Sequence, residues 1–263
     1  MRVFLVFLAL LLAAVPLSSG WAQDGRPPPP SARPAQDAGP PETMPLPAAP
    51  DKAVVVIFNH GTNRPQFRHV CNENRDVPGV MRDLAAAHGW LVHYLCSLAI
   101  DGNEPASYTY KRADEILALV AAYRAKGVPA AHIFLAGHSA GGWSSLMAAR
   151  KNHAGFNAIL AFAPAFAGTR AEQARWPEWR GEFLPRQIAY LRQAPRIDAL
   201  ILAYSDDEFE RPQDLKPLET IPGINLVAFD ACGAGHGTTY SECFRAGARA
   251  EIEDYIQRRL AKP

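Results

Sequence analysis

The feature that most constrains the fold of this chain is a series of short apolar runs that begins at residue 53. The runs occupy residues 53–58, 90–95, 133–136, 158–162, 197–204 and 224–229. Each is short and mostly unalternating, a pattern typical of strands that are covered on both faces. The segments between them have helical patterns. Strands and helices that alternate in this way predict an α/β fold, with a mostly parallel sheet of about six strands and helices on both faces.

Two of the intervening helices are well defined by their patterns. Residues 110–126 place apolar side chains along one stripe, and Gly127 and Pro129 follow as helix stops. The last segment, 242–260, repeats this pattern behind Ser241, which is a suitable N-cap residue. We expect one catalytic domain over residues 52–263, a length sufficient for a single substantial core.

The first 51 residues have a different character. Arg2, the apolar run 3–17 and the small residues that end at Ala22 predict a signal peptide over residues 1–22. The alternative is an uncleaved membrane anchor, but the run is shorter than the roughly twenty apolar residues that a spanning helix needs. Residues 23–51 are rich in proline and poor in bulky apolar side chains, which predicts a disordered linker. We therefore expect a secreted or periplasmic protein that is not stably inserted in a membrane.

The charge balance excludes one class of partner. The chain has 27 basic and 26 acidic residues and a formal net charge of +1. Binding to phosphate backbones requires an excess of positive charge, so nucleic acid is not an expected partner.

The four cysteines fit an oxidising compartment. Cys232 and Cys243 lie on either side of His236, and Cys71 and Cys96 follow two successive predicted strands whose ends meet at one sheet edge. We predict the disulfides Cys71–Cys96 and Cys232–Cys243. The alternatives are a metal site, for which the sequence has no CxxC or HxxxH spacing, and four free thiols. We expect no metal and no organic cofactor.

The motif that carries chemistry is GHSAG at residues 137–141, directly after the apolar run 133–136 and before a helical segment that starts at Gly142. A GxSxG sequence between a strand and a helix is typical of a nucleophile elbow, in which the serine occupies a sharp, strained turn. The alternative is a glycine-rich turn with a purely structural role. The context predicts that Ser139 is a catalytic nucleophile.

A serine hydroxyl needs a base to remove its proton and an acid to orient that base. His236 follows the last predicted strand, and we assign it as the base. Asp206 and Asp207 follow the run 197–204, so the chain order is Ser, Asp, His. We choose Asp207 as the acid, with Asp206 as the alternative at the same turn and Asp230 as a decoy nearer to the histidine.

Acyl transfer also requires N–H donors for the developing oxyanion. The amide of Ala140 is one candidate, because it follows the nucleophile. The second donor is expected in the loop after the first strand, 59–63, where we choose the amide of Thr62. His60 in this loop is expected to be a structural support.

On these motifs, residues 52–263 resemble the α/β-hydrolase superfamily, in an esterase-like or dienelactone-hydrolase-like branch. The resemblance is carried by HG at 60–61, GHSAG at 137–141, Asp207 and His236. It implies a cofactor-independent serine hydrolase. Ser139 stands where dienelactone hydrolases have cysteine, and the His-Gly loop follows the first strand instead of the third.

The expected reaction is cleavage of a small-molecule carboxylic ester through an acyl-enzyme. A serine peptidase or amidase, and a non-catalytic binding protein on the same fold, are the alternatives. The segment 164–195 is expected to be either a cover over the binding pocket or an ordinary helix packed on the sheet. Its aromatic residues, together with Trp143, indicate an apolar or aromatic substrate group.

Overall fold

In the computed structural model, the core of the chain is a six-stranded sheet in which every pair of neighbouring strands is parallel. The strands are β1 (Val55–Asn59), β2 (Leu91–Leu95), β3 (Ile133–His138), β4 (Ala158–Phe162), β5 (Ala199–Ala203) and β6 (Ile224–Ala228). Each apolar run of the sequence overlaps one of them, and β1 and β3 extend one and two residues beyond their runs. The prediction of a parallel sheet of about six strands is therefore confirmed.

In the strand order β2-β1-β3-β4-β5-β6, the second strand of the chain is added on one side of β1 and all later strands are added on the other side. Val55 of β1 is in register with Leu91 of β2 on one side and with Ile133 of β3 on the other. The chain passes from β1 outward to β2 and then returns past β1 to β3. The segments that leave β1 and β3 consequently pass to opposite faces of the sheet, and this is the point at which open parallel sheets form ligand-binding crevices.

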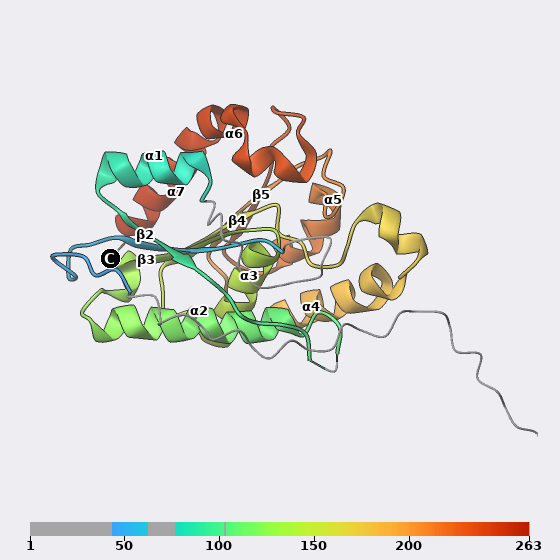
Figure 1. Ribbon diagram of the computed structural model, residues 1–263, viewed down its shortest axis with the longest axis horizontal. Coiled ribbons are helices and arrows are strands. Elements are labelled where there is room, and N and C mark those ends of the chain that lie inside the picture. The colour runs from blue at the N-terminus through green and yellow to red at the C-terminus, as the bar shows by residue number, and fades with distance from the viewer. Residues whose placement is uncertain (1–43, 63–76, 103, 263) are drawn as a thin grey trace, which may run out of the picture. The chain divides into compact units, whose positions relative to one another are not determined.

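Helices cover both faces of the sheet (Figure 1). One face carries α1 (Gly79–His88), α6 (Glu242–Gly247) and α7 (Arg249–Leu260), and the other carries α2 (Tyr108–Ala125), α3 (Ala140–Asn152) and α4 (Leu184–Leu191). The shorter elements are η1 (Ala130–His132), η2 (Arg170–Ala174), the π-helix η3 (Trp179–Phe183), α5 (Pro212–Leu215), η4 (Lys216–Thr220) and η5 (Gly235–Tyr240).

The side chains of β1 show why both faces must be covered. Val55 and Ile57 belong to the apolar cluster beneath α2, α3 and α4, whereas Val56 and Phe58 belong to the cluster beneath α1, α6 and α7. Successive side chains of a strand point to opposite faces, so an unbroken apolar run fits only a strand that is buried on both sides.

Two helix boundaries differ from the prediction. The segment after GHSAG begins at Ala140, where we expected Gly142. The expected helix 242–260 is divided at Ala248 into α6 and α7, although Ser241 caps it as predicted, since its Oγ accepts the Phe244 N–H at 3.1 Å. Gly247 ends α6, and a Cβ there would lie 3.1 Å from the ring of Phe229, so the close approach to the sheet favours glycine, a weak helix former.

The structure describes residues 44–62, 77–102 and 104–262. The predicted signal peptide and residues 23–43 of the predicted linker lie outside these ranges. Met44 packs against the core, and the carbonyl of Pro45 accepts a hydrogen bond from the Tyr123 hydroxyl at 3.1 Å. The last residues of the predicted linker are therefore in contact with the domain. Over the described ranges, no helix has the length and apolar character needed to span a membrane.

Candidate active site

Ser139 occupies a strained turn between β3 and α3. Its backbone has φ 54° and ψ −124°, a conformation that side-chain-bearing residues rarely adopt. Three backbone hydrogen bonds hold it there: its N–H donates to the Phe162 carbonyl at 3.0 Å, and its carbonyl accepts from Trp143 at 3.0 Å and from Ala165 at 3.2 Å. The turn lifts a partly exposed serine above the carboxyl edge of the sheet.

The glycines of the GHSAG motif make this turn possible. A Cβ on Gly137 would lie 2.5 Å from the backbone of Gly141, and a Cβ on Gly141 would lie 2.1 Å from the carbonyl oxygen of Asn59. Both distances are far below van der Waals contact. Glycine therefore allows the start of α3 to pack against the end of β3 and against the loop after β1.

His236 lies beside Asp207, the acid chosen from the sequence. The Nδ1 of His236 is 2.8 Å from Asp207 Oδ2, and the Asp207 side chain is fully buried. A carboxylate accepts hydrogen bonds, so Nδ1 carries the proton and Nε2 of the neutral ring has the lone pair that a base needs. The Nε2 atom is buried and has no hydrogen-bond partner within the described part of the chain. The structure thus joins Asp207 to His236 but does not join Ser139 Oγ to Nε2.

The side chains on either side of Asp207 accept hydrogen bonds from the backbone of the loop that contains His236. The N–H of Gly235 donates to Asp206 Oδ2 at 2.7 Å, and the N–H of His236 donates to Glu208 Oε2 at 3.1 Å. Asp206 therefore contacts the loop but not the imidazole. The decoy, Asp230, instead accepts from the N–H of Ser205 at 3.0 Å. Three consecutive acidic side chains at the end of β5 each make a contact in this region, which the sequence alone did not indicate.

Two aromatic side chains enclose the His236 ring. The ring of Phe209 lies 4.3 Å from it and that of His138 lies 4.6 Å from it, between centroids. His138 Nε2 also donates to the His236 carbonyl at 2.9 Å. Burial, together with the nearby His236, lowers the pKa of His138 to about 3, so His138 is neutral. Only the tertiary structure identifies His138 and Phe209, since neither has a sequence signal that links it to His236.

The candidate oxyanion donors lie on two sides of Ser139. Ala140 is the first residue of α3, and the first N–H groups of a helix have no partner within that helix. On the other side, a Cβ built on Gly61 would lie 3.3 Å from Ser139 Cβ, so the loop after β1 passes next to the serine. Thr62 is the next residue and is partly buried.

His60 makes the contacts of a structural support. Its Nε2 accepts the Ser97 N–H at 3.2 Å, which leaves the proton on Nδ1 to donate to the Gly61 carbonyl at 2.6 Å. Burial and the Arg112 cation lower the pKa of His60 to about 4. Arg112 is itself fully buried and donates to the His60 carbonyl at 2.7 Å. The two ring nitrogens therefore join the loop after β1 to the segment after β2.

Of the two predicted disulfides, the structure describes Cys232–Cys243. The S–S distance is 2.08 Å and the Cα–Cα distance is 5.6 Å. This bridge closes a loop of the chain that contains His236. Cys71 lies outside the described residues, so Cys71–Cys96 stays a prediction. Within the described ranges, no group of three His, Cys, Asp or Glu side chains is arranged to hold a metal ion.

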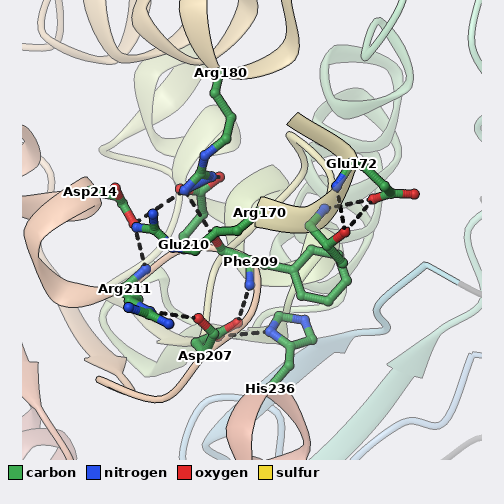
Figure 2. A network of polar contacts seen from close by, with 10 residues as sticks. Arg170, Glu172, Arg180, Asp207, Phe209, Glu210, Arg211, Asp214 and His236 are labelled. Carbon is green, nitrogen blue, oxygen red and sulfur yellow. Dashed lines mark hydrogen bonds and ion pairs between the residues drawn. The ribbon is translucent and has the colours of Figure 1, made fainter. Parts of the chain in front are cut away.

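The segment between β4 and β5 has two parts with different contacts. Gln187 of α4 accepts from Trp143 Nε1 at 2.6 Å, so α4 packs on α3 as an ordinary helix of the domain. The part before it contains Arg170 and Arg180, whose side chains meet the turn that follows Asp207 (Figure 2). The ordinary-helix interpretation therefore holds for α4, whereas a cover over the binding pocket stays a prediction for the portion before it, which contacts residues 209–214.

Comparisons with known proteins identify this fold. A family model described as "Putative esterase" matches residues 99–219, which include Ser139 and Asp207. Est1E from Butyrivibrio proteoclasticus, solved with ferulic acid bound, aligns with a TM-score of 0.56 and 19% identity over 81% of this chain and 92% of its own.

Two further solved structures are similar at comparable levels. A soluble variant of monoglyceride lipase from Saccharomyces cerevisiae aligns with a TM-score of 0.53 and 13% identity, over 80% of this chain and 88% of its own. An S-formylglutathione hydrolase from Agrobacterium tumefaciens aligns with a TM-score of 0.51 and 17% identity, over 80% and 85%. The search of curated proteins found no match. These similarities confirm the α/β-hydrolase fold expected from the sequence.

Proposed function

Starting from an α/β-hydrolase fold and an esterase-family match over residues 99–219, we propose that this chain is a serine hydrolase that cleaves carboxylic esters through an acyl-enzyme. The observation that carries the proposal is the combination of a serine at φ 54° in a strand-to-helix turn with a buried Asp207–His236 pair at 2.8 Å. A turn with only a structural role does not require either feature. The strained turn presents the Ser139 hydroxyl at the carboxyl edge of the sheet, and the pair supplies the proposed base.

The proposed first half-reaction forms the acyl-enzyme. Ser139 Oγ attacks the ester carbonyl carbon while His236 Nε2 takes the hydroxyl proton. The resulting imidazolium is stabilised by Asp207 through the Nδ1 hydrogen bond. The tetrahedral intermediate then collapses, the carbon–oxygen bond to the alcohol breaks, and His236 gives its proton to the departing alcohol.

The second half-reaction restores the enzyme. Water attacks the acyl carbon and passes a proton to His236 Nε2, and Ser139 leaves with that proton as the carboxylic acid is released. In both halves, the amides of Ala140 and Thr62 are our candidates for the oxyanion donors. The position of Ala140 at the N-terminus of α3 supports its assignment, because the helix dipole favours negative charge there.

Nε2 of His236 has no partner within the described part of the chain, so the proposal requires Ser139 Oγ to rotate or move toward it when substrate binds. Catalytic hydrogen bonds are often long or unaligned before substrate is present and tighten in the complex.

We further propose that the protein is exported and that residues 1–22 are removed. The disulfide Cys232–Cys243 supports this, because such bonds persist in oxidising compartments. Expression in a bacterium with an intact secretion pathway, followed by N-terminal sequencing of the periplasmic protein, tests it. A start at Gln23 is expected, and a start at Met1 in the membrane fraction would contradict it.

The test of the catalytic proposal is intact mass spectrometry after incubation with a fluorophosphonate, with Ser139→Ala as the matched control. One phosphonyl adduct on the wild type and none on the variant is expected. The absence of an adduct on folded wild-type protein would sink the serine mechanism. A panel of matched esters and amides then separates esterase from amidase activity, with faster ester turnover expected.

A further inference from the structure

The segment that joins β4 to β5 forms hydrogen bonds and ion pairs with the turn that carries Asp207. This inference rests on the proposed function, since it concerns the geometry of the proposed catalytic pair. The turn, residues 206–211, leaves the carboxyl end of β5 and contributes Asp207 to His236. Arg170 of η2 and Arg180 of η3, earlier in the chain, make polar contacts with this turn and with Asp214 of α5 just after it (Figure 2).

Arg180 makes three of these contacts. Its Nη1 donates to Glu210 Oε1 at 2.7 Å, and its Nη2 donates to the Phe209 carbonyl at 2.9 Å and lies 3.2 Å from Asp214 Oδ2. The side chain is only 5% exposed. A guanidinium is planar and presents its donors as a rigid fork, so it fixes the relative positions of the groups it binds.

Phe209, which Arg180 binds, contacts both members of the proposed catalytic pair, Asp207 and His236. Its N–H donates to Asp207 Oδ1 at 2.6 Å, and its ring packs 4.3 Å from the His236 ring. A shift of the Phe209 backbone would therefore turn the carboxylate and release one face of the imidazole together. Arg180 is connected to both groups through a single residue.

A second contact from the same segment acts in parallel. The N–H of Arg170 donates to the Glu208 carbonyl at 2.8 Å, and Glu208 Oε2 accepts the N–H of His236. The Arg170 side chain also pairs with Asp214, which accepts from the Arg211 N–H at 2.9 Å. Residues on both sides of Phe209 are thus fixed from the β4–β5 segment.

Stability alone does not account for the buried pair of Arg180 and Glu210. Glu210 is fully buried, and its Oε2 has no hydrogen-bond partner in the described ranges. Burial raises the pKa of Glu210, and the Arg180 cation only partly offsets this effect. Buried ion pairs often contribute less to stability than apolar residues of the same size. A directional role, which apolar residues do not supply, explains better why a guanidinium and a carboxyl group are placed there.

We propose that Arg180 is a positioning residue that orients the Asp207–His236 pair through Phe209. It does not touch substrate in this proposal. Its loss leaves the fold and the substrate pocket in place but lets the acid and base depart from their productive geometry. Small misplacements of this kind can lower turnover by up to ~100-fold.

The experiment compares Arg180→Gln and Arg180→Lys with the wild type. Hydrolysis of p-nitrophenyl acetate is expected to show kcat lowered ~10- to 100-fold in Arg180→Gln with KM little changed, because orientation and not binding is lost. Arg180→Lys retains a cation for Glu210 but has no fork, so a smaller loss and a native thermal transition are expected. This variant keeps the test decisive if Arg180→Gln does not fold.

Arg259→Gln is the matched control. Arg259 is also largely buried, and it binds Asp198 at 3.0 Å, just before β5, whereas Asp207 follows β5. The control removes a comparable ion pair at the opposite end of the same strand. It is expected to lower the melting temperature without lowering kcat. An equal loss of kcat in both variants at temperatures where both are folded would overturn the positioning role.

A readout independent of turnover separates this inference from the proposed function. The Nδ1 proton of His236, shared with Asp207, is followed by proton NMR and assigned with His236→Gln. We expect this resonance in the wild type and its broadening or upfield shift in Arg180→Gln. An unchanged resonance in folded Arg180→Gln overturns the role of Arg180. A wild type that shows the resonance but hydrolyses no ester and takes no fluorophosphonate refutes the proposed function alone.

Discussion

Acidification should destabilise this protein through histidines that are buried in their neutral form. Burial lowers the pKa of His138 to about 3, with a further contribution from His236, and burial with the Arg112 cation lowers the pKa of His60 to about 4, from a usual value of 6.5. Both side chains are less than 10% exposed, at 8% and 6%. The unfolded chain protonates these rings below pH 6.5, whereas the folded chain does not.

The sign and size follow from linkage. A lowered pKa in the folded state gives stability that is fully present above pH 6.5 and is lost as the pH falls toward the folded value. Between pH 8 and pH 5, each ring lowers the free energy of unfolding by about 2 kcal/mol. His60 and His138 together should lower the free energy of unfolding by about 4 kcal/mol over this interval, a large part of the stability of a typical domain.

The assay is urea unfolding at pH 8, 6.5 and 5 for the wild type and for His138→Gln. The glutamine amide can still donate to the His236 carbonyl but does not titrate, so the variant should lose about 2 kcal/mol less than the wild type between pH 8 and 5. Titrating groups that do not contact His138 contribute equally to both proteins and cancel. His153→Gln, at an exposed position, is the control and should follow the wild type. Identical pH dependence of His138→Gln and the wild type would refute the reasoning.

Three other outcomes are expected. Asp207→Asn should lower kcat by ~1,000-fold or more in an ester assay, because the amide favours the wrong histidine tautomer. Asp206→Asn leaves the imidazole contact intact and should lower kcat less than ~10-fold in the same assay. Replacement of Cys232 and Cys243 by serine should lower the free energy of unfolding by ~2 to 3 kcal/mol in urea titrations. It should also lower kcat at temperatures where the domain is still folded, because the loop around His236 loosens. An unchanged kcat would contradict this. Gly141→Ala should fail to give folded protein by circular dichroism, because its Cβ would lie 2.1 Å from a backbone oxygen; a native spectrum would mean that α3 can shift.

Local sequence patterns were sufficient to predict the sheet and the position of the serine. Each strand lies in a short apolar run, so the six strands could be recognised individually, although only the four inner strands are buried at every residue and the edge strands β2 and β6 are partly exposed. The GHSAG turn could be recognised for the same reason, because the strain at Ser139 and the need for Gly137 and Gly141 arise within a few residues of one another. The order of acid and histidine along the chain then restricted the remaining candidates.

Helix boundaries could be predicted less well. The last helix is divided at Ala248, next to Gly247, which lies close to Phe229, the residue directly after β6. A periodic pattern reports which face of a helix is apolar, but it does not report where a neighbouring strand interrupts the helix.

The sequence by itself determined the α/β class, the six strands, and Ser139, His236 and an acid at 206–207 as candidates, because these depend on composition and on short-range spacing. Only the tertiary structure decided that Asp207 and not Asp206 contacts the imidazole. It also decided that His138 and Phe209 contact His236 and that Arg180 binds the Phe209 carbonyl. These contacts join residues up to 98 positions apart, and their geometry depends on how separate elements pack against one another. No local pattern encodes that packing, so it becomes visible only once the chain has folded.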